Sequence, residues 1–138
     1  MKNLVKTTSI FALGLMLMAA QVNASVLDRE DKTVEKARAL AKDCAPDDWE
    51  AFAKAADMCI TKKVNLTEAK EWFEKSLAIK ESSLGHEVAG DYYMVSKLYR
   101  DAAKHYIQSM KLVKEKSNSA DLSELQAKVE KAIVKSKQ

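Results

Sequence analysis

Hydrophobic residues recur at helical spacing along most of the chain, with charged residues between them. This periodicity predicts a succession of amphipathic helices, each of which buries one apolar face. The breaks contain Pro46 and the polar run 117–119, and the chain has only three glycines, so strands and tight hairpins are not expected. The sequence therefore predicts an all-α fold, with helices at about 26–42, 49–62, 66–80, 86–95, 100–115 and 121–135.

Capping residues set several of these boundaries. Asp47 or Asp48 can cap the second helix, because a short acidic side chain accepts hydrogen bonds from the first free backbone N–H groups. Asn65 can cap the third helix, with Glu68 in the reciprocal position three residues on. Gly85 is expected to close the unit that contains this third helix.

The last two predicted helices have inward faces rich in apolar residues. In the fifth helix these are Ala102, Tyr106, Ile107, Met110 and Val113, and in the sixth they are Leu122, Leu125, Val129, Ala132 and Ile133. A stacked array leaves the apolar edge of its last unit open, and we expect the sixth helix to cover that edge with a polar outer face. The alternative is a detachable arm that occupies a groove of its own chain or of a partner.

One short helical pattern occurs twice, at a spacing of 33 residues. Three residues of the first copy correspond to three of the second: Phe73 to Tyr106, Ser76 to Ser109 and Leu77 to Met110. A period of this length is typical of helix–turn–helix units that cannot bury their apolar faces alone and stack on a neighbour. The period therefore favours a binding scaffold.

Small and aromatic residues follow a fixed order in the second copy. Gly90 comes first, and after it come Tyr93, Tyr99, Ala102, Tyr106 and Ser109. This order resembles a tetratricopeptide repeat, and the segment 72–81 resembles the second helix of a preceding repeat, of the kind found in kinesin light chains. The resemblance implies antiparallel helix pairs stacked as a short array, with units at about 49–81 and 84–115 and a C-terminal capping helix at about 121–135.

The resemblance also implies where a ligand would lie. Such repeats bind extended or helical peptides on the concave face formed by the first helix of each unit. Carried over to this chain, the groove positions are Lys54, Met58, Thr61, Lys62, Glu87, Asp91, Met94 and Val95. The methionines would give adaptable apolar contact, and Glu87 and Asp91 would repel a C-terminal carboxylate. The other interpretation is that these are ordinary exposed helix residues.

The N-terminus has the pattern of a secretory signal peptide. Lys2 and Lys6 precede the apolar run 10–20, and small residues at 22–24 predict cleavage after Ala24. The apolar run is shorter than the roughly 20 residues of a membrane-spanning helix, so no stable anchor is expected after processing. We expect a single exported domain, 25–138, in the periplasm, with secretion as the alternative.

Composition and charge narrow the classes of partner and chemistry. Loss of Lys2 and Lys6 with the signal peptide would take the formal net charge from +3 to about +1. Such a balance gives no electrostatic reason to expect nucleic acid or an anionic membrane as partner. The sequence has no glycine-rich phosphate loop, no serine-centred nucleophile elbow and no carboxylate dyad that stands out from the helical charge pattern. We therefore expect a protein that is not an enzyme, uses no cofactor and binds a protein or peptide.

The two cysteines, Cys44 and Cys59, leave two interpretations open. An exported chain favours a disulfide between them, because oxidising compartments promote pairing. If Cys44 lies at the turn and Cys59 about twelve residues along a straight helix, however, they are about 18 Å apart at 1.5 Å per residue, whereas a disulfide needs Cα atoms within about 7 Å. The pairing is the prediction, and it requires the Cys44 segment to fold back along the second helix.

Two further hypotheses come from the residues. Asp101 and His105 share a helix face and His86 could join them as metal ligands, but no recognised zinc spacing is present, and no metal is expected. The second hypothesis is a self-associating structural bundle, so a homo-oligomer is the alternative to a peptide-binding module. The residues that would form its interface are Leu122, Leu125, Val129 and Ile133.

Overall fold

The structure, a computed structural model, describes residues 21–138, with side chains from Lys32 onward. This part of the chain forms α1 (Gln21–Asp43), α2 (Trp49–Lys62), α3 (Leu66–Ile79), α4 (Ser83–Val95), α5 (Tyr99–Lys116) and α6 (Ser123–Lys135). It contains no strand, so the predicted all-α fold is confirmed. The predicted signal peptide lies outside the described residues as far as residue 20, and the predicted cleavage site falls at the start of α1.

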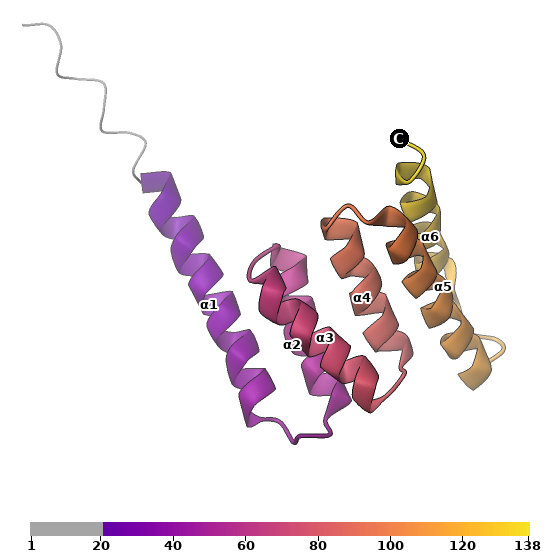
Figure 1. The fold of residues 1–138 in the computed structure, drawn as a ribbon, viewed down its shortest axis with the longest axis horizontal. Helices are drawn as coiled ribbons and strands as arrows, with labels where there is room; N and C mark the ends of the chain where they lie inside the picture. Colours follow the sequence, from indigo (N-terminus) through magenta and orange to yellow (C-terminus); the bar gives the residue numbers. More distant parts are fainter. Residues whose placement is uncertain (1–20) are drawn as a thin grey trace, which may run out of the picture.

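The helices form a row of packed neighbours (Figure 1). Helix α1 lies at one end of the row, the α2–α3 and α4–α5 pairs follow, and α6 closes the other end against α5. The two pairs are joined by contacts of α4 with both α2 and α3. Short connections turn the chain back on itself within each pair. The predicted array of adjacent helix pairs is therefore the observed architecture.

Two buried serines show that the 33-residue period is a structural repeat. The Ser76 hydroxyl donates to the carbonyl of Trp49, the first residue of α2, at 2.6 Å. The Ser109 hydroxyl donates to the carbonyl of Ser83, the first residue of α4, at 2.8 Å. Both serines are fully buried. Each hydroxyl thus ties the second helix of a pair to the start of the first helix, where no room remains for a larger side chain.

The helix boundaries confirm one predicted cap and correct another. The Asp48 carboxylate accepts from the backbone N–H of Ala51 at 2.9 Å, which confirms it as the cap of α2. Asn65 does precede α3, but its side chain does not cap the backbone. It has a left-handed conformation with φ of 45°, and its amide donates instead to the Glu68 carboxylate at 2.8 Å. Glu68 is also bound by Arg38 from α1.

The start of α4 differs from the prediction. Helix α3 ends at Ile79, and Gly85 lies in the first turn of α4 rather than closing the unit before it. The reason is Ser82, whose hydroxyl accepts from the backbone N–H of Gly85 at 3.0 Å and so caps a helix that begins three residues earlier than expected.

The buried residues fall into two clusters. The first joins α1 to α4 and is built largely from alanines around Ile60, Phe73 and Val88. The second joins α5 and α6 around Tyr106, Leu122 and Leu125. The residues of α4 link the two: Tyr93 packs against both clusters. The abundance of buried alanine lets the helix backbones approach closely, and the aromatic rings fill the spaces that remain.

Helix α4 lies very close to α5 at Gly90. A Cβ at this position would lie 2.4 Å from the Tyr106 ring of α5. We predict that Gly90→Ala lowers the free energy of unfolding by roughly 1–3 kcal/mol, because the fixed ring must move. Gly85→Ala is the matched control: its new Cβ would meet the flexible end of Leu77 at 2.8 Å, so a smaller loss is expected. Urea unfolding of both variants measures the difference, and equal losses would contradict this account.

Candidate functional site

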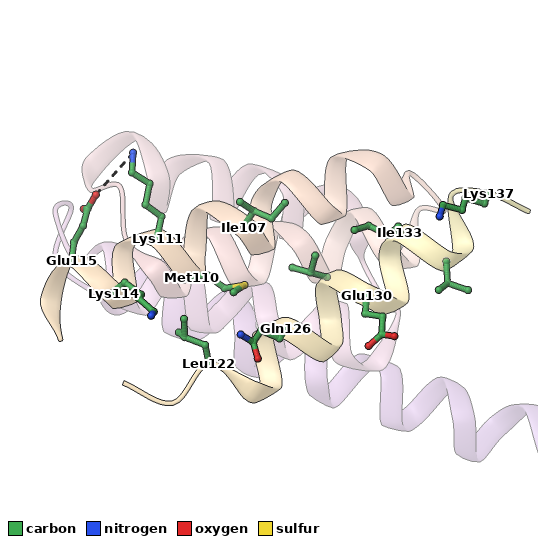
Figure 2. A pocket seen from close by; sticks show the side chains of 12 residues that line it. Ile107, Met110, Lys111, Lys114, Glu115, Leu122, Gln126, Glu130, Ile133 and Lys137 are labelled. Carbon is green, nitrogen blue, oxygen red and sulfur yellow. Dashed lines mark ion pairs between the residues drawn. The ribbon is translucent and has the colours of Figure 1, made fainter. Parts of the chain in front are cut away.

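An apolar groove of about 890 Å³ runs between α5 and α6. It opens on the side of these helices that no other described helix covers, as Figure 2 shows. Apolar side chains form its floor and charged side chains its rim. The apolar residues are Ile107, Met110, Leu122, Val129, Ile133 and Val134, and the polar and charged ones are Lys111, Lys114, Glu115, Gln126, Glu130 and Lys137.

Three large apolar side chains of this groove are exposed to solvent. Ile107 is 53% exposed, Ile133 40% and Val134 52%. The prediction that Ile107 and Ile133 point inward is therefore wrong, and so is the prediction that α6 has a polar outer face. The physical reason is that α6 packs on α5 through Leu122, Leu125 and Ala132, which leaves a second apolar stripe on the open side of the pair.

Helices α5 and α6 run antiparallel, and two cation–π contacts fix their register. Lys135 lies 5.5 Å from the ring of Tyr99, and Lys128 lies 5.7 Å from the ring of Tyr106. The end of α5 therefore lies beside the start of α6, and the end of α6 beside the start of α5. Figure 2 shows the consequence for the rim: Glu115 lies at one end of the groove, Lys137 lies at the other, and Ile107 is between them.

Two of the predicted concave positions form an ion-pair cluster with α6. The Lys128 ammonium donates to the Glu87 carboxylate at 2.7 Å and to Asp91 at 3.0 Å, and the Tyr106 hydroxyl donates to Asp91 at 2.7 Å. Burial alone would lower the pKa of Lys128, but the hydrogen bonds to the two carboxylates outweigh it and raise the pKa. The acidic pair that was expected to face a ligand is therefore engaged by Lys128.

The remaining predicted concave positions differ in burial and in their contacts. Lys54 pairs with Glu50 at 2.6 Å, and the Thr61 hydroxyl donates to Asp57 at 3.3 Å. Lys62 is exposed near the end of α2. The apolar members, Met58, Met94 and Val95, are half-buried and pack against the two core clusters. These positions together form a mixed polar surface rather than the apolar groove that the structure shows elsewhere.

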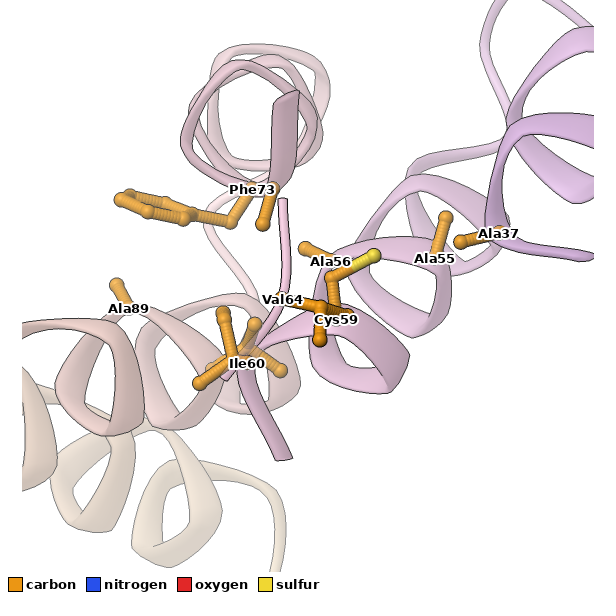
Figure 3. Packing of buried hydrophobic residues seen from close by; sticks show 10 residues of the cluster. Ala37, Ala55, Ala56, Cys59, Ile60, Val64, Phe73 and Ala89 are labelled. Carbon is orange, nitrogen blue, oxygen red and sulfur yellow. The ribbon is translucent and has the colours of Figure 1, made fainter. Parts of the chain in front are cut away.

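Cys44 and Cys59 are free thiols, so the predicted disulfide is not formed in this structure. Figure 3 shows Cys59 inside the first cluster, among Ala55, Ala56 and Val64. It is fully buried, and desolvation raises the pKa of its thiol. The Cys44 thiol donates instead to the Ala41 carbonyl at 3.4 Å.

The two histidines of the chain meet between α4 and α5. The Nδ1 atoms of His86 and His105 lie 3.0 Å apart, and the His105 ring stacks on Tyr93 at 5.2 Å between ring centroids. Asp101, the third residue of the metal hypothesis, pairs with Lys104 at 2.9 Å instead. Within the described residues no group of three or more metal-binding side chains comes together.

Sequence reasoning missed Lys128 and Val134. Val134 carried a usable signal, because its position next to Ile133 makes the apolar stripe of α6 too wide for one helix contact. Lys128 carried none, since it is one of several lysines on the same helix and only its contacts with Glu87 and Asp91 of α4 distinguish it.

Comparison with known protein families, with curated proteins and with solved structures returned no match for this chain. Among the described helices, none is both long and apolar enough to cross a membrane.

The histidine pair predicts a pH dependence of stability. Burial lowers the pKa of both imidazoles, and for His105 the neighbouring His86 lowers it further. The unfolded chain therefore binds more protons than the folded chain as pH falls below the ordinary value of 6.5, so stability is full above that pH and declines below it. We expect urea unfolding to show this loss between about pH 6.5 and 5, before the carboxylates titrate.

His105→Phe is the test of this assignment, because phenylalanine keeps a ring against Tyr93 but cannot take up a proton. The variant should have a flatter pH profile over the same range. A wild-type profile with no slope there would contradict the role of the histidine pair.

The contacts of Lys128 predict a stabilising role for this side chain. Lys128→Met leaves two half-buried carboxylates without their partner, and we expect the free energy of unfolding to fall by roughly 1–3 kcal/mol. Lys131→Met, at an exposed position of the same helix, is the control and should change it by less than about 0.5 kcal/mol. Chemical denaturation compares the two variants, and similar values for both would show that the cluster contributes little.

Proposed function

We propose that this protein is an exported protein-interaction module that binds a helical polypeptide segment in the α5–α6 groove. The observation that supports this most is that Ile107, Ile133 and Val134 are exposed and line the same apolar groove. Exposed apolar surface that is gathered in one place, with a polar rim, is typical of a docking site. Scattered exposed residues would need no such explanation.

The shape of the site favours a helix as its occupant. The groove runs along two antiparallel helices, as in other cases where an amphipathic helix lays its apolar face between two others. A helix in this place would also continue the row of packed helices beyond α6. The resemblance to tetratricopeptide repeats supports the same class of function, because such arrays bind polypeptides and are extended by stacking further helices.

The energetics set a requirement on the contact. Fully burying a large aliphatic side chain stabilises by about 1.5–3 kcal/mol. The residues of the groove are already partly buried, so a partner adds only the fraction of this energy that belongs to their exposed area. Association also has an entropic cost estimated at about 4–15 kcal/mol. A partner must therefore cover most of the apolar floor at once, and a contact with only one or two of these side chains would not persist.

The concave surface is the second candidate for a binding face. Its support is the resemblance, which assigns Lys54 of α2 and Glu87 and Asp91 of α4 to one face. Against it, Glu87 and Asp91 are engaged by Lys128, and Lys54 is paired within its own helix. The α5–α6 groove is preferred because covering its exposed apolar side chains removes apolar surface from water, which favours binding. The predicted signal peptide supports an activity outside the cytoplasm, in the periplasm or in the medium.

Ile107→Glu tests the proposed function. A carboxylate in the middle of the apolar floor should weaken polypeptide binding at least tenfold, because the charge would lose its water on docking. Leu98→Glu is the matched control: Leu98 is 50% exposed, close to the 53% of Ile107, and does not line the groove. The measurement is quantitative recovery of bound polypeptides, including tagged copies of the chain itself, by the immobilised protein from an extract of its own cells.

The two variants must differ for the proposal to stand. Polypeptides retained by the wild type and by Leu98→Glu, but lost with Ile107→Glu, support it. Equal recovery by both variants would contradict it. Circular dichroism of each variant confirms that the fold persists, which the exposure of both positions favours.

A further inference from the structure

We infer that His86 and His105 form an acid-sensitive latch between α4 and α5, in which one shared proton joins the two rings and a second positive charge on the pair separates them. The latch is independent of the α5–α6 groove and of what binds there. Three observations carry it: the distance between the two Nδ1 atoms, the direction in which the rings face each other, and the polar groups around their other nitrogens.

The two rings face each other through a single hydrogen. Their Nδ1 atoms are 3.0 Å apart and their centroids 5.2 Å apart. The difference between these distances is close to two ring radii, so each Nδ1 points at the other ring, and the stacked ring of Tyr93 holds His105 in this orientation. Two lone pairs or two N–H groups would repel at this distance, so one Nδ1 donates and the other accepts. The two neutral histidines are therefore opposite tautomers.

Glu81 decides which ring donates. It precedes α4, and its carboxylate lies 3.7 Å from Nε2 of His86, a buried atom that has no hydrogen-bond partner. A carboxylate only accepts hydrogen bonds, so a buried N–H turned toward it is more stable than a buried lone pair. His86 therefore has its proton on Nε2 and accepts at Nδ1, and the Nδ1–H group of His105 donates. The free lone pair of the two rings is on Nε2 of His105.

The pair can take up one proton and keep this contact. Nε2 of His105 accepts the proton, which leaves the Nδ1–H···Nδ1 bond in place and makes it charge-assisted. When the shared proton crosses to His86, the positive charge moves to the ring that faces Glu81. Asp101 favours a charge on His105, and Lys104, which pairs with Asp101 at 2.9 Å, opposes it. In the described part of the chain, neither α3 nor α6 adds a charge that acts on either ring.

A second proton breaks the contact. The remaining lone pair is the one that accepts the shared hydrogen, so its protonation turns two N–H groups toward each other. Both rings are then cationic in a place where burial already lowers the pKa of each. Like charges at this separation repel in a partly desolvated site, so the rings must move apart.

The separation begins at the start of α4. His86 lies in the first turn of this helix, where its backbone N–H donates to the carbonyl of Ser82 at 3.1 Å. About one turn further on, Gly90 lies against the Tyr106 ring and keeps the rest of α4 on α5. The latch therefore loosens one turn rather than the whole array. For the exported chain that the sequence predicts, this makes the α4–α5 pair responsive to the pH of its surroundings.

The tautomers can be read directly from the ring nitrogens. In protein with isotope-labelled histidine, NMR spectra at about pH 8, where both rings are neutral, correlate each nitrogen with the ring hydrogens. We expect Nδ1–H on His105 and Nε2–H on His86, and His105→Phe assigns the signals by removing one set. Nε2–H on both rings, or the reverse assignment, would overturn the inference.

Glu81→Gln tests the path of the first proton. The same spectra, followed as pH falls, should show two separate steps of proton uptake for the wild type. Glu81→Gln should move the first step to lower pH, because the charge on His86 loses its carboxylate. Glu71→Gln, an exposed position of α3, is the control and should leave both steps unchanged. Equal effects of the two variants would contradict the role of Glu81.

Backbone hydrogen exchange measures the opening. After correction for the intrinsic effect of pH, protection of the His86 N–H should fall between about pH 6.5 and 5, while protection of Ile60 in α2 persists. In His105→Phe the same acidification should leave the His86 N–H protected, because a single ring cannot acquire two charges. Equal loss at His86 in both proteins would overturn the latch. Simultaneous loss at Ile60 would also overturn it, since the whole array would then be unfolding.

Discussion

The fold depends on the burial of apolar surface on both sides of each helix pair. In the middle of the row, neighbouring helices bury these surfaces: the α2–α3 pair lies against α4, and α4–α5 lies between the first cluster and α6. Close packing follows from it, since Gly90 admits the Tyr106 ring and two buried serines bind the helix starts. At the end of the row, α6 buries only one of its apolar sides, the side that packs against α5. Its other side, with the exposed side chains of α5, forms the groove.

Polar contacts decide which side of α6 remains open. Lys128 reaches across to Glu87 and Asp91, while Leu125 and Ala132 pack on α5. These contacts fix the rotation of α6 about its own axis, so Ile133 and Val134 are turned toward solvent. The same cluster occupies the acidic pair on the concave side. The Lys128 contacts therefore engage the acidic residues of the concave surface and at the same time leave the α5–α6 groove exposed.

The sequence was sufficient for the helices and their pairing, because periodicity reports which face of a helix is buried. The Asp48 cap and the 33-residue repeat followed from local rules. The start of α4 did not follow from these rules, because Ser82 and Gly85 form a helix cap, whereas a glycine at this position is equally compatible with the end of the preceding unit. Periodicity predicts that Ile107 and Ile133 point inward, because it cannot distinguish an apolar face that the chain covers from one that stays exposed. The role of Lys128 depends on tertiary contact and had no local signal.

The central claim, that the α5–α6 groove is covered in the working protein, is tested most directly by the solvent accessibility of isoleucine methyl groups. A soluble paramagnetic agent broadens the NMR signals of methyls that it can approach. Ile60, which is 2% exposed, and Ile79, which is 37% exposed, provide the buried and exposed references in the same spectrum. If the groove is covered, Ile107 and Ile133 behave like Ile60 in the presence of the polypeptides recovered with the wild-type protein, although both are more exposed than Ile79 in a single chain. Broadening of Ile107 and Ile133 at least as strong as that of Ile79 would contradict it.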